Sequence, residues 1–138
     1  MVMDWATYDE WLAQVPVCIV EDPLWEFETY RRALFLADLA WQDCEQLQGH
    51  SIGKYLVSQL INSAGSPSAN IEEGYGRGFG KDYARFLRIA LGSAREARGW
   101  YYKNRHAFDP AVVEHRLSLA TELIKNLTIA ANQQRRRY

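Results

Sequence analysis

The sequence has few of the residues on which disulfide scaffolds, zinc sites and membrane spans depend. Its two cysteines, Cys18 and Cys44, have neither C-x-x-C nor Cys/His finger spacing, which excludes a disulfide framework and a zinc finger. No charged and then apolar leader with a cleavage site opens the chain, so we expect both thiols to be reduced in a cytoplasm. The apolar runs are far shorter than the roughly 18 residues that cross a bilayer, so we predict no membrane span.

Catalytic motifs are missing as well. The three histidines, His50, His106 and His115, lack the spacing of metal ligands, and neither G-x-S-x-G nor H-E-x-x-H occurs. Glu72 and Glu73 are adjacent, and adjacent helical side chains point about 100° apart, so they cannot face each other as an acid–base pair. We therefore expect no enzyme, no bound metal and no cofactor.

The composition is that of one folded domain. With 138 residues, 48% of them apolar and 24% charged, the chain is close to the globular average and long enough to bury a core. The net charge of -1 conceals a division, because residues 1–50 carry ten acids and two bases, whereas residues 51–138 carry seven acids and fourteen bases. The two halves either have different partners or attract each other.

Apolar residues at helical spacing predict helices only. A short helix runs from Asp4, a candidate N-cap, to about Gln14, and a connector follows in which Val17–Val20 is strand-like but has no partner strand. Four long helices follow, with short connections, at about residues 24–47, 51–73, 81–105 and 110–132. The predicted fold is all-α: an antiparallel up-and-down four-helix bundle with a short extra N-terminal helix. We divide the chain into an N-terminal extension (1–23), the bundle (24–132) and a basic C-terminal tail (133–138).

Candidate N-caps and a proline predict where two of these helices begin and where one of them bends. Ser51 is a candidate N-cap for the second long helix, and Asp109 followed by Pro110 is a cap and first-turn pair for the last one. Pro67 predicts a kink, because proline removes a backbone donor and crowds the carbonyl four residues earlier. The first long helix is apolar on two sides and therefore needs two partners, for one of which another subunit is a candidate.

The second long helix carries a stripe of polar side chains. With 100° between successive residues, the stripe contains Gln59, Ser63, Ser66 and Asn70, with Asn62 and Glu73 at its edge. One interpretation is a groove that recognises a ligand or an RNA base edge. The interpretation that we favour is a structural hydrogen-bond network that satisfies the backbone groups freed by Pro67.

A glycine-rich run at residues 74–80 follows this helix. It is not a Walker-type phosphate loop, because Gly80-Lys81 is followed by Asp82 and a helix precedes the glycines. A helix cap and a hairpin loop explain the glycines. An equally weighted interpretation is functional, because the run presents Tyr75, Arg77 and Phe79, which are of the kinds that stack on bases and pair with phosphates.

The third long helix is divided between an apolar face and a basic face. Lys81, Arg85, Arg88, Arg95 and Lys103 lie within about 40° of one line, with two glycines between them, whereas apolar residues cover the opposite side. This pattern favours contact with a phosphate backbone. Two alternative interpretations remain for these cations: they form a solvated stripe, or they pair with the acidic first long helix. The arginines of the C-terminal tail would add affinity for polyanions without specificity.

Part of the chain resembles a known protein family. The resemblance lies in Gln59-Leu60, Ala64, Ser66, Asn70-Ile71, Glu73-Gly74, Gly76-Arg77, Phe86-Leu87, Ile89-Ala90 and Gly92-Ser93, and its most specific part is the N-I-x-E-G-x-G-R run at 70–77. This pattern resembles the four-helix-bundle family of 23S rRNA intervening-sequence proteins, which is related to the accessory variability determinants of diversity-generating retroelements. Two positions depart from the family. Ile61-Asn62 replaces a common Arg-Arg pair, and the family's proline stands one place after Pro67.

The resemblance implies a small antiparallel bundle that assembles into a ring-like homopentamer without known catalytic activity. Its retroelement relatives bind nucleic acid and a reverse transcriptase through a basic surface. The leading hypothesis is therefore a non-enzymatic, oligomeric accessory protein that binds nucleic acid, RNA by preference, through Arg77, Lys81, Arg85, Arg88, Arg95, Lys103, Arg135, Arg136 and Arg137, with Tyr75 and Phe79 as base-stacking candidates. The alternative is a protein-interaction scaffold without a nucleic-acid role, in which Trp5, Trp11 and Trp25 contact a partner.

Overall fold

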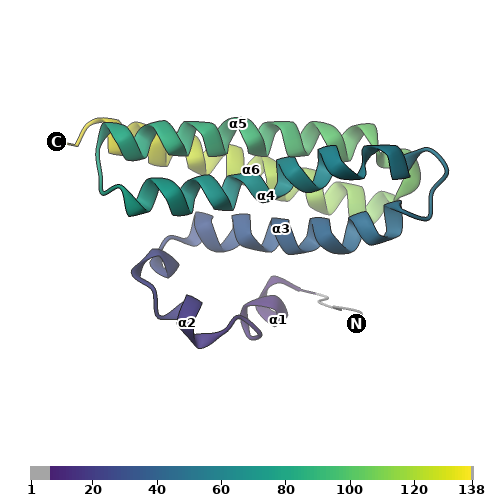
Figure 1. The fold of residues 1–138 in the computed structure, drawn as a ribbon, viewed down its shortest axis with the longest axis horizontal. Coiled ribbons are helices and arrows are strands. Elements are labelled where there is room, and N and C mark those ends of the chain that lie inside the picture. The colour runs from purple at the N-terminus through teal and green to yellow at the C-terminus, as the bar shows by residue number, and fades with distance from the viewer. Residues whose placement is uncertain (1–6, 138) are drawn as a thin grey trace.

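Four long helices make up most of the protein (Figure 1). The computed structural model describes residues 7–137, and within that range it contains helices and no strand. The long helices are α3 (Glu28–Leu47), α4 (Val57–Gly76), α5 (Lys81–Lys103) and α6 (Pro110–Arg135). Consecutive helices run in opposite directions, so the predicted all-α, antiparallel up-and-down bundle is confirmed.

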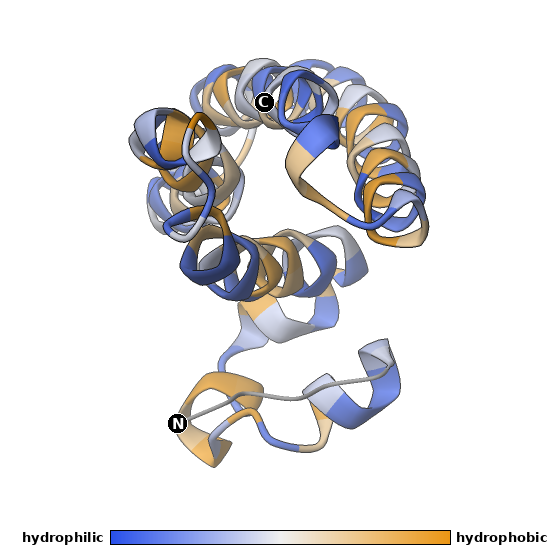
Figure 2. Ribbon diagram, turned by 90° about the vertical axis from the view of Figure 1, so that its right-hand side faces the viewer, coloured by the Kyte–Doolittle hydropathy of each residue, from blue (hydrophilic) through white to orange (hydrophobic). Residues whose placement is uncertain are grey.

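The order of the helices around the bundle separates α3 from α5. Both α3 and α5 pack against α4 and α6, so α3 and α5 occupy opposite corners. A view along the bundle shows the four helices around a common axis, with the N-terminal extension outside them (Figure 2). Each helix contributes a leucine with no exposed surface to the core: Leu36, Leu60, Leu87 and Leu127. The acidic helix α3 and the basic helix α5 thus lie on opposite sides of the core.

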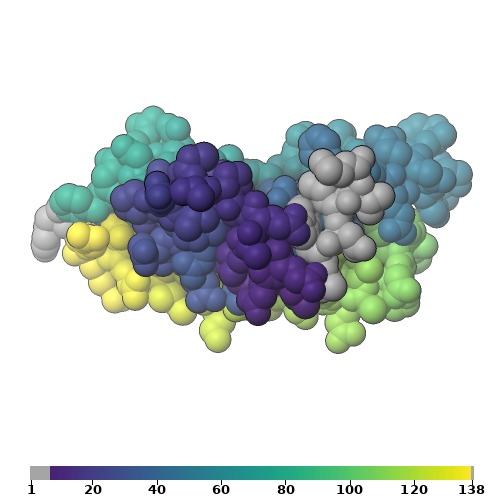
Figure 3. Space-filling model, turned by 90° about the horizontal axis from the view of Figure 1, so that it is seen from below, coloured from purple at the N-terminus to yellow at the C-terminus, as the bar shows by residue number. Residues whose placement is uncertain are grey.

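The N-terminal extension is helical and lies along the outer side of α3. It consists of α1 (Tyr8–Leu12), α2 (Val17–Val20) and the 3-10 helix η1 (Pro23–Glu26), and it crosses the α3 side of the molecule (Figure 3). Thr7 is the N-cap of α1, since its Oγ1 accepts from the Glu10 N–H at 3.2 Å. The predicted cap Asp4 and the candidate contact residue Trp5 lie outside the described residues.

The strand-like interpretation of Val17–Val20 is wrong. These residues form one helical turn, in which the Pro16 carbonyl accepts from the N–H groups of Ile19 and Val20 at 3.0 and 3.1 Å. A proline at this point begins a helical turn readily, because its φ is already close to the helical value. With no second strand in residues 7–137, local hydrogen bonds satisfy the backbone instead.

An aromatic cluster joins the extension to the second apolar face of α3. Trp11 is 2% exposed and lies 5.3 Å from Phe35 and 6.3 Å from Trp25, measured between ring centroids. Its indole Nε1 donates to Asp38 Oδ2 at 2.8 Å. The chain therefore covers the second face of α3 with its own extension, where we had considered another subunit. Trp11 is buried in this cluster and is therefore not accessible to the partner for which it was predicted, whereas Trp25 is half-buried.

Two helices begin later than the sequence predicted. Asp22 Oδ1 accepts from the Leu24 N–H at 2.9 Å and caps η1, so the segment before Glu28 is a separate 3-10 turn and α3 begins at Glu28. Ser51 is not the N-cap of α4, because the 3-10 helix η2 (Gly53–Leu56) intervenes. The His50 imidazole organises this connection, since its Nδ1 accepts from the Gly53 N–H at 2.9 Å.

The remaining helix limits agree more closely with the predictions. Asp109 caps α6 through a 2.9 Å bond from the Ala111 N–H to its carboxylate, as predicted. Pro67 lies inside α4, which continues through it from Val57 to Gly76. The final helix extends to Arg135, beyond the predicted end at residue 132, because Gln133 and Gln134 continue its hydrogen bonding. The tail predicted from residue 133 thus begins, within the described residues, at Arg136.

Replacement of Trp11 tests the contribution of the extension to stability. Trp11→Ala should lower the free energy of unfolding by about 3–5 kcal/mol, because it removes a large buried ring and the hydrogen bond to Asp38. Urea unfolding monitored by circular dichroism measures this loss. Trp41→Ala is the matched control, since that ring is 56% exposed and its loss should cost far less. Equal stability of the two variants would mean that the extension is not part of the folded core.

Candidate functional site

The basic face of α5 lies on the outside of the bundle. Lys81, Arg85, Arg88, Arg95 and Lys103 are all exposed, and we call these five residues the α5 basic face. The opposite side of the helix is buried through Leu87, Ala90, Ala94, Ala97 and Tyr101. Because the apolar stripe faces the core, the cationic side chains face solvent. The predicted division of this helix into a packed and a basic face is therefore present in the structure.

Acidic residues of α3 do not neutralise the α5 basic face. Among residues 7–137, the ion pairs of this region are local: Arg85 with Asp82 at 3.5 Å, and Arg77 with Glu73 at 3.2 Å and Asp82 at 3.7 Å. These pairs are exposed and hence weak. The predicted alternative, pairing with the acidic first long helix, does not occur on this face, because α3 stands at the opposite corner.

Three residues of the α5 basic face form no ion pair with a carboxylate in the described part of the chain. Arg88 Nη2 donates to Asn132 Oδ1 at 3.0 Å, and Lys103 Nζ lies 4.2 Å from the Trp100 ring centroid. Arg95 has no hydrogen bond or ion pair to the described residues and borders a hollow between α5 and α6. Neutral partners orient a cation without cancelling its charge, so this part of the surface attracts anions.

Only the second half of the glycine-rich run is a loop. Helix α4 continues through Gly76, and the loop is confined to residues 77–80, where Gly78 and Gly80 have φ of 105° and 83°. Both values lie in the left-handed region that favours glycine. Gly74 serves packing instead, since a Cβ on it would lie 2.6 Å from Phe86 Cβ. The helix-cap and hairpin interpretation therefore describes the backbone of this run.

The loop and the C-terminus form one cluster. Phe79 is 53% exposed, and the Arg137 guanidinium lies 4.9 Å from its ring centroid. The Gly80 N–H donates to Gln134 Oε1 at 3.1 Å, which ties the loop to α6. Tyr75 is less accessible, because it stands edge-on to Tyr83 at 6.1 Å. The structure thus brings Phe79 and Arg137, 58 positions apart in sequence, to the same end of the α5 basic face.

Only part of the polar stripe on α4 forms a network. Ser66 Oγ is 2.7 Å from Ser93 Oγ on α5, and Asn70 Nδ2 donates to Ser66 Oγ at 2.9 Å and to the Ser66 carbonyl at 3.0 Å. Ser63 Oγ donates to the Leu60 carbonyl of its own helix at 3.1 Å. Two further members do not join this network: Glu73 pairs with Arg77, and Gln59 is exposed. The network links α4 to α5. Pro67 has no N–H to donate to the Ser63 carbonyl, but the Asn70 amide donates to the Ser66 carbonyl instead. The network therefore does not satisfy the carbonyl that Pro67 leaves without its helical donor.

Sequence analysis missed a buried ion pair near the end of the bundle at which α3 and α5 finish and α6 begins. Arg116 of α6 contacts Asp43 of α3 through Nε at 2.7 Å and Nη2 at 3.1 Å, and the Tyr101 hydroxyl of α5 donates to Asp43 Oδ2 at 2.7 Å. The side chains of Arg116 and Asp43 are 11% and 5% exposed. Asp43 lies between Leu36, Ala40 and Leu47 at core spacing, a signal that could have predicted its burial.

These contacts shift the pKa values of Tyr101, Arg116 and the neighbouring His115. Burial, and then the charge of Asp43, raises the pKa of Tyr101 well above its usual value. Burial lowers the pKa of Arg116, but the hydrogen bond to Asp43 and its charge outweigh burial and raise that pKa overall. Burial lowers the pKa of His115, as does the neighbouring Arg116. The Arg116–Asp43 pair and the Tyr101 hydroxyl together join α3, α5 and α6.

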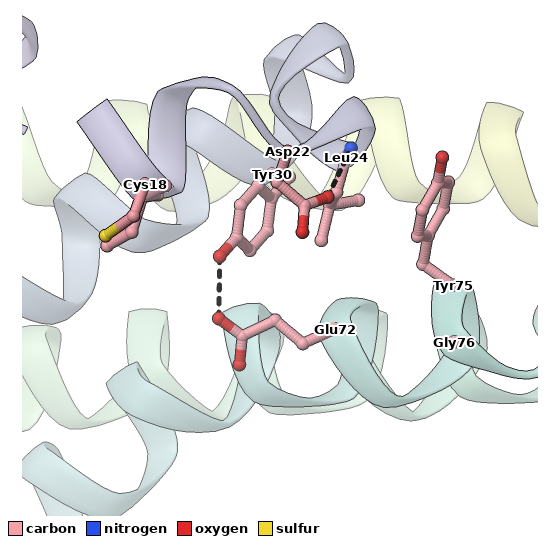
Figure 4. Close-up of a pocket in the computed structure, with 8 residues that line it drawn as sticks. Cys18, Asp22, Leu24, Tyr30, Glu72, Tyr75 and Gly76 are labelled. Carbon is pink, nitrogen blue, oxygen red and sulfur yellow. Dashed lines mark hydrogen bonds between the residues drawn. The ribbon is translucent and has the colours of Figure 1, made fainter. Parts of the chain in front are cut away.

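A pocket of about 340 Å³ lies between the extension and α4 (Figure 4). The Tyr30 hydroxyl donates to Glu72 Oε2 at 2.6 Å, and Asp22 also lines the pocket. Burial and then the hydrogen bond to Glu72 raise the pKa of Tyr30. Two carboxylates in a small pocket repel anions, so this pocket is chemically distinct from the α5 basic face.

The described residues show no arrangement typical of a metal site or a membrane span. No group of three or more His, Cys, Asp or Glu side chains in residues 7–137 is arranged to hold a metal ion. None of the helices in that range combines the length and apolar character that a bilayer crossing requires. Cys18 is exposed and Cys44 is buried, and both are free thiols.

Comparison with known proteins locates the bundle within a family. Residues 26–129 match the family described as 23S rRNA-intervening sequence protein. A solved structure of a protein of unknown function from the S23 ribosomal protein family of Bacteroides thetaiotaomicron has 22% sequence identity and a TM-score of 0.68. That match covers 73% of this chain and 95% of the other, which shows the same fold. No curated protein matches the chain.

The buried ion pair can be tested by removing one partner. Arg116→Met should lower the free energy of unfolding by about 3–5 kcal/mol, because it leaves the Asp43 carboxylate buried without its cation. Urea unfolding measures the loss, and adding Asp43→Leu to Arg116→Met should recover a large part of it. The control Arg85→Met removes an exposed pair and should cost about 1 kcal/mol or less. A similarly small cost for Arg116→Met would refute the structural role.

Alkaline pH should weaken the fold through its buried tyrosines. Below about pH 10 the folded and unfolded forms both keep the Tyr101 proton, so the contribution of Tyr101 to the free energy of unfolding is fully present. Above that pH the unfolded chain loses the proton first, and stability falls by up to about 1.4 kcal/mol per pH unit for each such tyrosine. Burial raises the pKa of Tyr83 to about 12, so this residue adds to the fall. Urea unfolding of Tyr101→Phe should show a shallower decline from about pH 9 to about pH 11; an unchanged decline would contradict this account.

Proposed function

The chain belongs to the family of 23S rRNA-intervening sequence proteins, and from this premise we propose that it is a non-enzymatic, oligomeric accessory protein that binds RNA. The observation that carries the proposal is the α5 basic face, which is exposed at the corner opposite α3. An RNA backbone is a regular array of negative charges, and it is attracted to a row of exposed cations of which only Arg85 pairs with a carboxylate in residues 7–137. The acidic side of the molecule repels the same strand and thereby orients the protein on it.

The dimensions of the face suit a nucleic-acid backbone. Helix α5 has 23 residues, so its cations are distributed over about 33 Å. Arg88 and Arg95 have no carboxylate partner in residues 7–137, and guanidinium groups pair well with phosphate oxygens. Several weak contacts along this length add up to a binding surface with little sequence preference.

The cluster at the loop end supports the same proposal. Phe79 presents an exposed ring beside the Arg137 guanidinium, and Arg77 lies on the same short loop. An aromatic ring next to a cation is the arrangement on which single-stranded bases stack in many nucleic-acid-binding proteins. Lys81, Arg135 and Arg136 belong to the same end through the contact between the loop and α6. Tyr75 has a smaller part in this proposal, because Tyr83 packs against its edge.

Self-association belongs to the proposal as well. Trp41, Ile52 and Tyr55 are 56%, 70% and 75% exposed on the α3–α4 side, and large apolar side chains gathered on a surface often mark a protein contact. We propose that a second copy covers them and that the assembly is the homopentamer that the family resemblance implies. Repetition of the α5 basic face in an assembly would multiply weak phosphate contacts. A reverse transcriptase is the proposed protein partner, on the resemblance to retroelement accessory proteins.

The alternative function, a protein scaffold without RNA, has less support. It relied on Trp11 and Trp25 as contact residues, and both pack within the extension and against α3. It also requires that α3 or an acidic partner neutralise the basic half. In the part of the chain that the structure describes, one ion pair joins the two halves, Asp43 with Arg116, and it leaves the α5 basic face untouched.

Replacing two arginines tests the proposal. Arg85→Gln combined with Arg88→Gln should weaken the binding of labelled single-stranded RNA and should reduce the slope of log affinity against log salt by about 1.4, because each phosphate contact contributes about 0.7. Electrophoretic mobility shifts between about 50 and about 200 mM salt provide both quantities.

Arg32→Gln combined with Lys54→Gln is the matched control. It makes the same change in net charge on the α3 and η2 side of the molecule, so the slope should stay at the wild-type value. Circular dichroism verifies that both double variants remain helical. An unshifted RNA band with excess wild-type protein at low salt would refute the proposal, and so would equal slopes for the two double variants.

A further inference from the structure

Two neighbouring hollows lie along α6, one against α5 and the other against the 3-10 helix η3 (Arg105–Ala107) that follows it. The larger, of about 520 Å³, is lined by Arg95, Arg98, Gly99, Tyr102, Leu117 and Thr121. The smaller, of about 370 Å³, is lined by Arg105, Pro110, Val113, Glu114, Leu117 and Ser118. Leu117 borders both hollows, so they are neighbours, and we call them together the α5–α6 groove. Volumes of this size are typical of sites that hold small organic groups.

The charge of the groove favours an anion. Three arginines line it, against the single carboxylate of Glu114. Arg98 Nη1 donates to Thr121 Oγ1 at 3.2 Å, which holds the guanidinium at the groove without cancelling its charge. Arg95, Arg98 and Arg105 form no ion pair with any carboxylate in residues 7–137. An uncompensated cluster of guanidinium groups beside an apolar floor selects a ligand with both an anionic and an apolar part.

Tyr102 offers a surface for a flat ring. It is 53% exposed, and the Arg105 guanidinium lies 4.1 Å from its ring centroid, held by a 3.0 Å bond to the Tyr102 carbonyl. Gly99 stands three residues earlier and is therefore its neighbour on the helix surface. A Cβ on Gly99 would meet nothing within 4 Å, so space is open beside the tyrosine. The arrangement offers an aromatic ring, a cation and an adjoining gap.

We infer that the α5–α6 groove binds an unpaired stretch of RNA, with a base against Tyr102 and the flanking phosphates at Arg95 and Arg98. The inference rests on the proposed function and identifies the form of RNA that the protein selects. Bases within a duplex are stacked on one another, whereas bases of a single strand are free to lie on an aromatic side chain. The α5 basic face then holds the backbone of the same strand, because Arg95 belongs to both surfaces.

Photocrosslinking locates the base directly. The full chain is irradiated with a single-stranded RNA that contains 4-thiouridine, digested with trypsin and analysed by mass spectrometry. The expected crosslink is in the peptide of residues 99–103, which contains Tyr102 and is distinct from the peptide of residues 78–81, which contains Phe79. Unlabelled single strand should abolish the crosslink, and the same sequence as a duplex should compete poorly.

Substitution of Tyr102 provides the second measurement. Tyr102→Ala should weaken single-strand binding by roughly tenfold and leave duplex binding within about twofold of wild type, whereas Tyr102→Trp should retain both. Val17→Ala is the control and should bind both forms of RNA as the wild type does, because that side chain is also exposed, at 67%, and lies on α2, outside the α5–α6 groove, the α5 basic face and the surface proposed for self-association. Since Tyr102 is exposed, its loss should not prevent folding, which circular dichroism checks.

The outcomes separate this inference from the proposed function. If RNA binds with the salt dependence expected of the α5 basic face, but residues 99–103 give no crosslink and Tyr102→Ala binds single strands normally, the inference is wrong and the proposed function stands. If the wild-type protein binds no RNA, both fall. Binding of a labelled polyglutamate peptide that Tyr102→Ala abolishes, without RNA binding, would assign the groove to an acidic protein segment and overturn the inference.

Discussion

A helix in a four-helix bundle can bury only the stripe of side chains that faces its two neighbours, and this constraint determines the distribution of charge in the protein. Helices α4 and α6 both pack between α3 and α5, which places the acidic and basic helices at opposite corners. The five cations of the α5 basic face cannot enter the core, and the carboxylates of α3 cannot reach them across it. The exposed basic surface is therefore a consequence of packing order.

The side of α3 that faces away from the bundle is apolar and is buried by the N-terminal extension. Its apolar residues are covered by the extension through Trp11 and its aromatic neighbours, which lie before the segment that matches the family. This cover gives the molecule two unlike sides: a closed aromatic layer over α3 and an open cationic surface on α5. A nucleic-acid strand therefore has one side of the molecule to which charge directs it.

Arginines in the basic half serve two different purposes. Arg116 is buried against Asp43 and the Tyr101 hydroxyl, so its charge stabilises the junction of three helices. Arg95 and Arg98 meet no carboxylate in the described chain, and their charge remains available at the α5–α6 groove. From sequence alone the two kinds are alike, because the partner of Arg116 stands 73 positions away. Counting basic residues therefore overestimates the charge that faces a ligand.

The sequence alone determined the helical class, the cap at Asp109, the continuation of α4 through Pro67 and the division of α5 into two faces. Each of these depends on residues within a few turns of one another, where the 3.6-residue period and the chemistry of caps are decisive. The tertiary structure decided which helices stand at opposite corners, that the extension covers α3, that Phe79 meets Arg137 and that Tyr102 borders a groove with α6. Those relations depend on contacts between distant segments, and local spacing carries no information about which segment a helix face will meet.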